Sequence, residues 1–87
     1  MAANDSRARM REFVTRALRS TTLEDGDDIF RVGGATSLFA MELVIFIEKQ
    51  FGVALDDNDL ERANFATIDA LTALVDRKRA ESKGDRR

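Results

Sequence analysis

The chain has 87 residues, of which 44% are hydrophobic, and its formal net charge is −2. This length leaves room for one small domain with a core and excludes a second one. The absence of Cys and His excludes a disulfide framework, a Cys-based metal site and the side chains that most often activate a catalytic serine. No Pro and few Gly indicate helices rather than strands. We therefore expect one all-α domain spanning residues 1–87.

The small net charge conceals a strong segregation along the chain. Residues 1–20 hold five basic and two acidic side chains, residues 21–76 hold three and twelve, and residues 77–87 hold six and two. An acidic middle favours a partner with a basic surface, although a solvated face explains any single carboxylate equally well. For the basic tail we prefer solubility and interaction with a helix dipole over nucleic-acid binding.

The first predicted helix covers residues 5–20, with Asp5 or Ser6 as its cap. The N-terminus lacks a signal-peptide pattern and no apolar run approaches ~20 residues, so we expect a soluble, cytoplasmic protein. The apolar stripe of this helix is wide enough for core packing but not for lying on a membrane. Its members are Met10, Phe13, Val14, Ala17 and Leu18.

A long connection follows, from Ser20 to Thr36, without sustained periodicity. A loop of this length is unusual in a compact domain unless it is functional or anchored. We expect Asp27 and Asp28 to begin a short helical turn. The predicted anchors of the loop are Leu23, Ile29, Phe30 and Val32.

Ser37 lies where a glycine-containing loop becomes a strongly apolar helix, predicted from Ser37 to about Phe51. Gly33 and Gly34 allow unusual backbone conformations before this turn, and Thr36 or Ser37 can cap the helix. A helix start also attracts anions. Because the chain has no His or Cys, Ser37 is a better candidate for a modified substrate than for a nucleophile, although an ordinary cap also fits the pattern.

This second helix is apolar on two sides. One stripe should face the core, flanked by Phe39 and Phe46, and it comprises Ala40, Leu43, Val44, Ile47 and Phe51. A small domain cannot bury both sides of one helix, so we interpret the opposite ridge as a docking surface. The alternatives are packing on another part of the chain or on a second copy. The ridge consists of Leu38, Met41 and Ile45, edged by Glu42 and Glu48.

After this helix, Gly52 should act as its C-terminal cap. The acidic cluster that follows lacks the Gly and Glu of a calcium loop, so we expect no metal site, and a short helix is predicted through Leu60 to Ala63. Phe65 should fill the core and Thr67 should cap a last helix. The buried stripe of that helix is Ile68, Leu71, Leu74 and Val75. Fraying is expected after Asp76, with a core of about 5–79 and a disordered basic tail of about 80–87.

Four runs of the sequence together resemble the acyl carrier proteins: D-I-F at 28–30, G-G-A-T-S-L at 33–38, E-L-V at 42–44 and I-E-K-Q-F-G at 47–52. The resemblance covers nearly the whole chain. It implies a four-helix bundle with three longer helices, one short helix and a long first loop. It also implies that Ser37 receives 4′-phosphopantetheine from coenzyme A.

The resemblance further implies how the protein meets its partners. In carrier proteins, partner enzymes bind the residues that match the ridge and its edge, which here are Leu38, Met41, Ile45, Glu42 and Glu48. This chain has Thr36 where most members have Asp, which bears on which phosphopantetheinyl transferase recognises it. It also has Phe39 where an acid is common, so we expect docking to depend more on apolar contact and less on charge.

The function implied is that of a free-standing, monomeric carrier that binds neither membrane nor nucleic acid. The thiol of its arm holds acyl groups as thioesters for acyl-loading enzymes, tailoring enzymes and polyketide synthase domains in polyketide or antibiotic biosynthesis. The amino-acid sequence of the second helix is similar to that of discrete carriers of hydroxymalonyl- or methoxymalonyl-type extender units.

Three alternatives were compared with this function. A peptidyl carrier uses the same chemistry on amino acids. An unmodified helical adaptor would bind partners directly through Leu38, Met41 and Ile45. A helix-turn-helix DNA binder needs a basic recognition helix, and both inner helices here are apolar or acidic, which argues against it.

Overall fold

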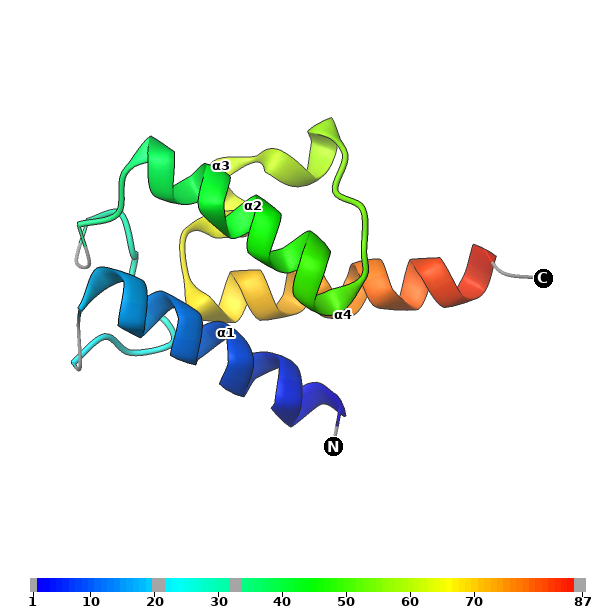
Figure 1. Cartoon of the computed structure of the whole chain (residues 1–87), viewed down its shortest axis with the longest axis horizontal. Helices are drawn as coiled ribbons and strands as arrows, with labels where there is room; N and C mark the ends of the chain where they lie inside the picture. The colour runs from blue at the N-terminus through cyan, green and yellow to red at the C-terminus, as the bar shows by residue number, and fades with distance from the viewer. Residues whose placement is uncertain (1, 20–21, 32–33, 86–87) are drawn as a thin grey trace.

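The computed structural model describes residues 2–19, 22–31 and 34–85, and within these ranges the only regular elements are helices. The three long helices are α1 (Ala2–Leu18), α2 (Ser37–Phe51) and α4 (Ile68–Asp85). A 3-10 turn, η1 (Asp57–Leu60), and the short helix α3 (Arg62–Phe65) connect α2 to α4 (Figure 1). The predicted all-α four-helix bundle with a long first loop is therefore confirmed.

Helix α4 is the element on which the others pack. α1 makes its most extensive contacts with α4, α3 also lies against α4, and α2 crosses it (Figure 1). The ring of Phe13 on α1 stacks on Phe46 of α2 with the centroids 4.0 Å apart, which joins those two helices at their outer side. The core residues are Met10, Val14, Leu23, Ile29, Phe39, Leu43, Ile47, Val53, Phe65, Ile68, Leu71, Leu74 and Val75.

The boundaries of α1 differ from the prediction. The helix begins at Ala2 rather than residue 5, and the predicted cap Ser6 lies inside it, fully buried. There the Ser6 hydroxyl accepts a hydrogen bond from the Arg79 guanidinium of α4 at 3.0 Å, so its role is to join two helices. α1 ends at Leu18 because Arg19 adopts a left-handed φ of 56°.

The predicted stripes face the core, but not every member is buried. In α1 Ala17 is exposed. In α2 Leu43 and Ile47 are fully buried and Phe39 is buried rather than flanking the stripe, while the other predicted members are partly buried, namely Ala40, Val44 and Phe51. All four predicted residues of α4 are fully buried, and the Thr67 hydroxyl caps that helix by accepting from the Ala70 N–H at 2.9 Å. Periodicity therefore located the core-facing sides correctly.

The long first loop is anchored to the bundle through its described residues 22–31. Arg7 forms ion pairs with both Asp25 and Asp69, and Arg11 forms one with Asp25 at 2.7 Å. The backbone of the loop also pairs with the chain before α4, where the Ile29 N–H donates to the Ala66 carbonyl at 2.7 Å. These contacts hold the loop along the bundle and fix where it delivers α2.

The side chains predicted to anchor this loop behave as expected where they are described. Leu23 and Ile29 are fully buried and Phe30 is partly buried. The Asp28 carboxylate accepts from the Phe30 N–H at 2.9 Å, which forms the predicted turn. Val32 lies outside the described residues.

The segment between α2 and α4 corrects the single short helix predicted there. It forms two pieces, because Asp56 and Asp59 cap η1 reciprocally and Glu61 then takes an extended conformation before α3. The Asp59 carboxylate also pairs with the Lys78 ammonium of α4 at 2.9 Å. These acidic groups therefore have structural partners, and among the described residues no cluster of acidic groups suits a metal ion.

Helix α4 continues past Asp76 to Asp85, through a segment where fraying was predicted. Lys78 and Arg79 explain the first part of this extension, since Lys78 bonds to Asp59 and Glu81 and Arg79 bonds to Ser6. Of the predicted basic tail, residues 86 and 87 lie outside the described residues. No helix in the described ranges has the length and apolar character needed to span a bilayer.

Candidate functional site

Ser37 is the first residue of α2, and its side chain is exposed. The backbone reaches it through Gly34, whose φ of 76° is a conformation that favours glycine. Gly33 lies outside the described residues. The loop thus turns sharply and presents Ser37 at the end of the bundle where α2 begins.

Thr36, and not Ser37, caps α2. The Thr36 hydroxyl accepts a hydrogen bond from the Phe39 N–H at 3.3 Å, with Thr36 in the extended conformation typical of a cap. Within the described part of the chain the Ser37 hydroxyl has no hydrogen-bond partner, so it is available to an outside reagent. Of the two residues predicted as possible caps, Thr36 caps the helix and Ser37 does not.

The surroundings of Ser37 suit an anionic substituent. The first N–H groups of α2 have no helical partner, and the first turn of the helix contains no acidic residue. A phosphodiester on the serine would therefore meet positive potential rather than a neighbouring carboxylate. The sequence contains no His or Cys that could activate the hydroxyl.

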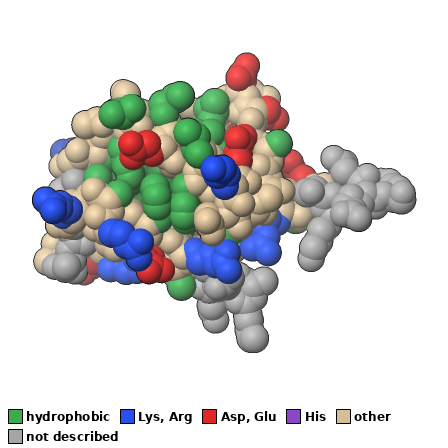
Figure 2. Space-filling view, viewed as in Figure 1, with side chains coloured by type: hydrophobic (Ala, Val, Ile, Leu, Met, Phe, Trp, Pro, Cys, Tyr) green, Lys and Arg blue, Asp and Glu red, His purple; other side chains and the backbone are tan. Residues whose placement is uncertain are grey.

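The predicted ridge of α2 is exposed. Leu38, Met41 and Ile45 keep 71%, 63% and 55% of their surface accessible, whereas Leu43 and Ile47 on the opposite side are fully buried. Figure 2 shows hydrophobic side chains gathered over α2 with charged side chains at their edge. An unburied apolar strip of this kind on a small domain is the arrangement expected of a docking surface.

The two glutamates predicted to edge the ridge differ from each other. Glu42 is exposed on α2, one turn beyond Leu38. Glu48 is also exposed, but its carboxylate accepts a hydrogen bond from the Leu55 N–H at 3.0 Å and so holds the chain that leaves α2. Both glutamates are exposed, as the predicted edge of the ridge requires, but sequence spacing could not reveal the contact between Glu48 and Leu55.

A pocket of about 310 Å³ lies beside Ser37, between α2 and the η1–α3 segment. Its wall is apolar apart from the serine and one arginine, Arg62. The lining residues are Phe30, Ser37, Ala40, Met41, Val44, Leu60, Arg62 and Phe65. Sequence analysis did not identify Leu60 or Arg62 as site residues, because nothing in the local pattern connects α3 with the start of α2.

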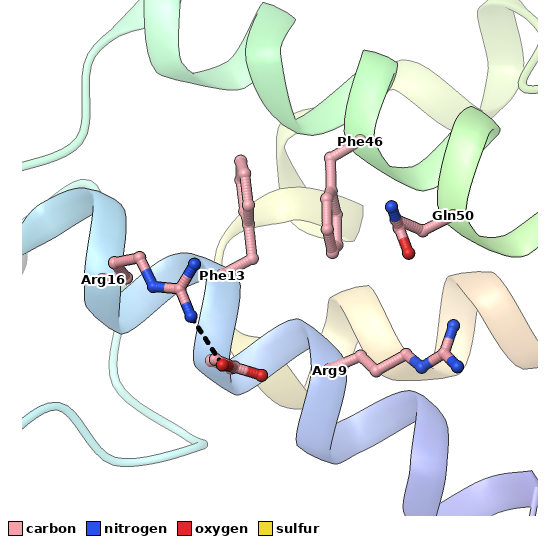
Figure 3. A pocket seen from close by; sticks show the side chains of 6 residues that line it. Arg9, Phe13, Arg16, Phe46 and Gln50 are labelled. Atoms are coloured by element: carbon pink, nitrogen blue, oxygen red, sulfur yellow. Dashed lines mark hydrogen bonds and ion pairs between the residues drawn. The ribbon is translucent and has the colours of Figure 1, made fainter.

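A second pocket, of about 270 Å³, lies between α1 and α2, and the stacked rings of Phe13 and Phe46 form part of its wall. Figure 3 shows the two rings side by side, with Arg9, Arg16 and Gln50 around them. Ser37 does not line this pocket. The candidate site is therefore the first pocket, which Ser37 does line, at the start of α2.

The sequence matches the profile of the phosphopantetheine attachment site family over residues 8–75. The chain belongs to this family. Comparison with curated proteins gave no match. The match extends from α1 well into α4, so it includes the loop, α2 and the η1–α3 segment that form the site.

Membership has direct consequences. The domain is a carrier rather than an enzyme, and it bears 4′-phosphopantetheine in covalent linkage. Carrier domains of this kind meet phosphopantetheinyl transferases and the enzymes that load, extend or modify their cargo. The exposed hydroxyl, the unpaired N–H groups and the adjoining pocket fit a phosphodiester with an attached arm.

Proposed function

We propose that this chain is an acyl carrier protein whose 4′-phosphopantetheine is attached to Ser37. The observation that carries the proposal is that Thr36 alone caps α2, which leaves the exposed Ser37 hydroxyl without a partner among the described residues. Because Thr36 supplies the cap, modification of Ser37 leaves the capping hydrogen bond of α2 in place.

The attachment step is performed on this chain by a transferase. The Ser37 oxygen forms a bond to the phosphorus of coenzyme A that carries pantetheine, its proton passes to a base on the transferase, and 3′,5′-ADP leaves. The Mg²⁺ and the base belong to that enzyme. Once attached, the arm supplies a thiol that holds an acyl group as a thioester. Residues of this chain orient the arm and present it.

The docking surface for the transferase and later enzymes is the exposed ridge with its neighbours. Leu38, Met41 and Ile45 supply the apolar contact, and Glu42 with Glu48 supplies the acidic rim. Thr36 adjoins this surface through its position before Ser37. Tethering an acyl group here raises its effective concentration for each enzyme that docks.

For the cargo we propose acyl groups of polyketide or related secondary-metabolite biosynthesis, including a hydroxymalonyl- or methoxymalonyl-type extender unit. The support for the acyl rather than the peptidyl branch is the sequence I-E-K-Q-F-G at the end of α2 and the acidic middle of the chain. We also propose that the carrier is a monomer and that it works in the cytoplasm.

The test is intact-mass spectrometry after incubation with coenzyme A, Mg²⁺ and a broad-specificity transferase. We expect one phosphopantetheine on the wild type and none on Ser37→Ala. Thr67→Ala is the matched control, because it removes a capping hydroxyl elsewhere and should leave the modification intact. No addition with several transferases would favour the adaptor alternative, in which the ridge binds a partner directly.

A further inference from the structure

Arg62 is the one charged residue that lines the pocket beside Ser37. The other residues of its wall are apolar, apart from Ser37 itself. Arg62 comes from the η1–α3 side of the pocket and Ser37 from the α2 side, so an arm leaving the serine would run past or into a cavity that contains a single cation.

The guanidinium of Arg62 is held in place by an aromatic ring. Its central carbon lies 4.6 Å from the centroid of the Phe30 ring, which belongs to the loop that leads to Ser37. Contact with a ring face orients a guanidinium and leaves its N–H donors at the edge available. Phe30 is itself partly buried against the core, so the platform is fixed.

No carboxylate in the described part of the chain pairs with Arg62. This contrasts with Arg7 and Arg11 of α1, which both form ion pairs with Asp25. It is also notable because residues 21–76 hold only three basic side chains among twelve acidic ones. A cation kept beside an apolar pocket without an internal counter-ion is suited to an external anion.

We propose that Arg62 binds an anionic oxygen of the group that is attached through Ser37. This inference rests on the proposed function and adds a specificity-determining residue to it. The anion has two possible sources with the same chemistry: the phosphodiester next to Ser37, or the carboxylate of a carboxyacyl thioester folded back into the pocket. In both cases a forked pair of N–H donors meets two anionic oxygens.

The test observes the anion directly. The wild type and Arg62→Gln are converted to three forms with a broad-specificity transferase and coenzyme A, acetyl-coenzyme A or ¹³C-carboxyl-labelled malonyl-coenzyme A. The ³¹P resonance of the phosphodiester and the ¹³C resonance of the carboxylate are then compared. A ³¹P shift between wild type and Arg62→Gln in all three forms identifies the phosphodiester. A ¹³C shift in the malonyl form without a ³¹P shift identifies the carboxylate.

Arg77→Gln is the matched control, since Arg77 is exposed on α4 and does not line the pocket. It removes the same charge and should shift neither resonance. Arg62→Lys keeps the charge without the planar fork and should give a smaller shift than Arg62→Gln. Identical ³¹P and ¹³C resonances in wild type and Arg62→Gln overturn the proposal. Failure of the proposed function would be seen separately, as wild-type protein that gains no phosphopantetheine mass.

Discussion

At the scale of single residues, Thr36 and Ser37 divide two tasks that one residue often performs. Local sequence was sufficient to find this pair, because glycine followed by Thr-Ser before an apolar helix is a short-range signal. It could not say which hydroxyl caps the helix, since both positions satisfy the rule. The hydrogen bond from Phe39 to Thr36 decides that question.

Thr36→Ala should destabilise the fold, whereas Thr36→Asp should not. The alanine variant loses the cap of α2, which typically costs about 1 kcal/mol of unfolding free energy and lowers the melting temperature of a domain this size by about 4–8 °C. Aspartate retains an accepting oxygen and adds a charge that suits a helix start. Urea denaturation followed by circular dichroism measures the difference.

Ser37→Ala is the control for this prediction, because the Ser37 hydroxyl makes no hydrogen bond among the described residues. Its midpoint should equal that of the wild type. Equal midpoints for Thr36→Ala and the wild type would show that the Thr36 hydroxyl contributes nothing as a cap. Transferase rates on Thr36→Asp would show in the same samples whether the family's usual aspartate improves recognition.

Arg62 and Phe30 illustrate what sequence reasoning at this scale could not find. Phe30 was predicted only as an anchor of the loop and Arg62 was not singled out, and their contact exists only because the long loop and the η1–α3 segment are brought to the same end of α2. No periodicity or capping rule relates positions so far apart. Their contact is a consequence of tertiary packing.

At the scale of elements, periodicity predicted the helices well where one side is buried. It located the core-facing sides of α2 and α4. It also predicted correctly that the ridge of Leu38, Met41 and Ile45 is exposed. It failed at the start of α1 and at the end of α4, where Ser6 and Arg79 support each other across two helices. Helix ends that depend on such a partner have no local signal.

The η1 turn is attached to α4 by the pair of Asp59 and Lys78, and we predict that acid loosens this attachment. Burial favours a higher pKa for Asp59, but the hydrogen bonds from the Asp56 N–H and from Lys78 outweigh it and hold the pKa below its usual value. Bonding to Asp59 and then to Glu81 raises the pKa of Lys78. Both charges are therefore present at neutral pH.

Because the folded pKa of Asp59 lies below its unfolded value, its contribution to stability is complete above about pH 4 and is lost as the pH falls through the folded pKa. Asp59→Asn should lower the melting temperature at pH 7 by a few degrees and should flatten its decline in acid. Asp57→Asn, an exposed neighbour, is the control. Melting curves from pH 7 to pH 2 give the measurement, and parallel declines for wild type and Asp59→Asn would contradict the assignment.

At the scale of the whole molecule, the acidic middle and basic ends of the sequence form one bundle in which several charges are already paired. Asp25, Asp56, Asp59 and Asp69 each bond to a basic side chain of α1 or α4. The segregation that the sequence shows is therefore partly neutralised by folding. Because these aspartates are paired within the bundle, fewer unpaired carboxylates are left to attract a basic partner than the composition alone indicates.

We therefore predict that recognition by a transferase depends more on the apolar ridge than on charge. Met41→Ala should lower kcat/KM for phosphopantetheine transfer by about tenfold, the effect of about 1.4 kcal/mol, because Met41 lies in the middle of the ridge and truncation of a central apolar contact is where interface losses above 1 kcal/mol are concentrated. Glu42→Gln should lower it by less, as expected for a charge at the rim. Since Met41 and Glu42 are both exposed, neither change should alter the melting temperature.

Ionic strength provides the second measurement of the same prediction. Raising it from about 0.01 M to about 0.15 M shortens the Debye length from about 30 Å to about 8 Å and suppresses steering between exposed charges. If apolar contact dominates, kcat/KM for the wild type falls only a few-fold over this range, and the ratio of wild type to Met41→Ala stays constant. A steep salt dependence that disappears in Glu42→Gln would instead assign recognition to the acidic rim, and the ridge would then be a secondary contact.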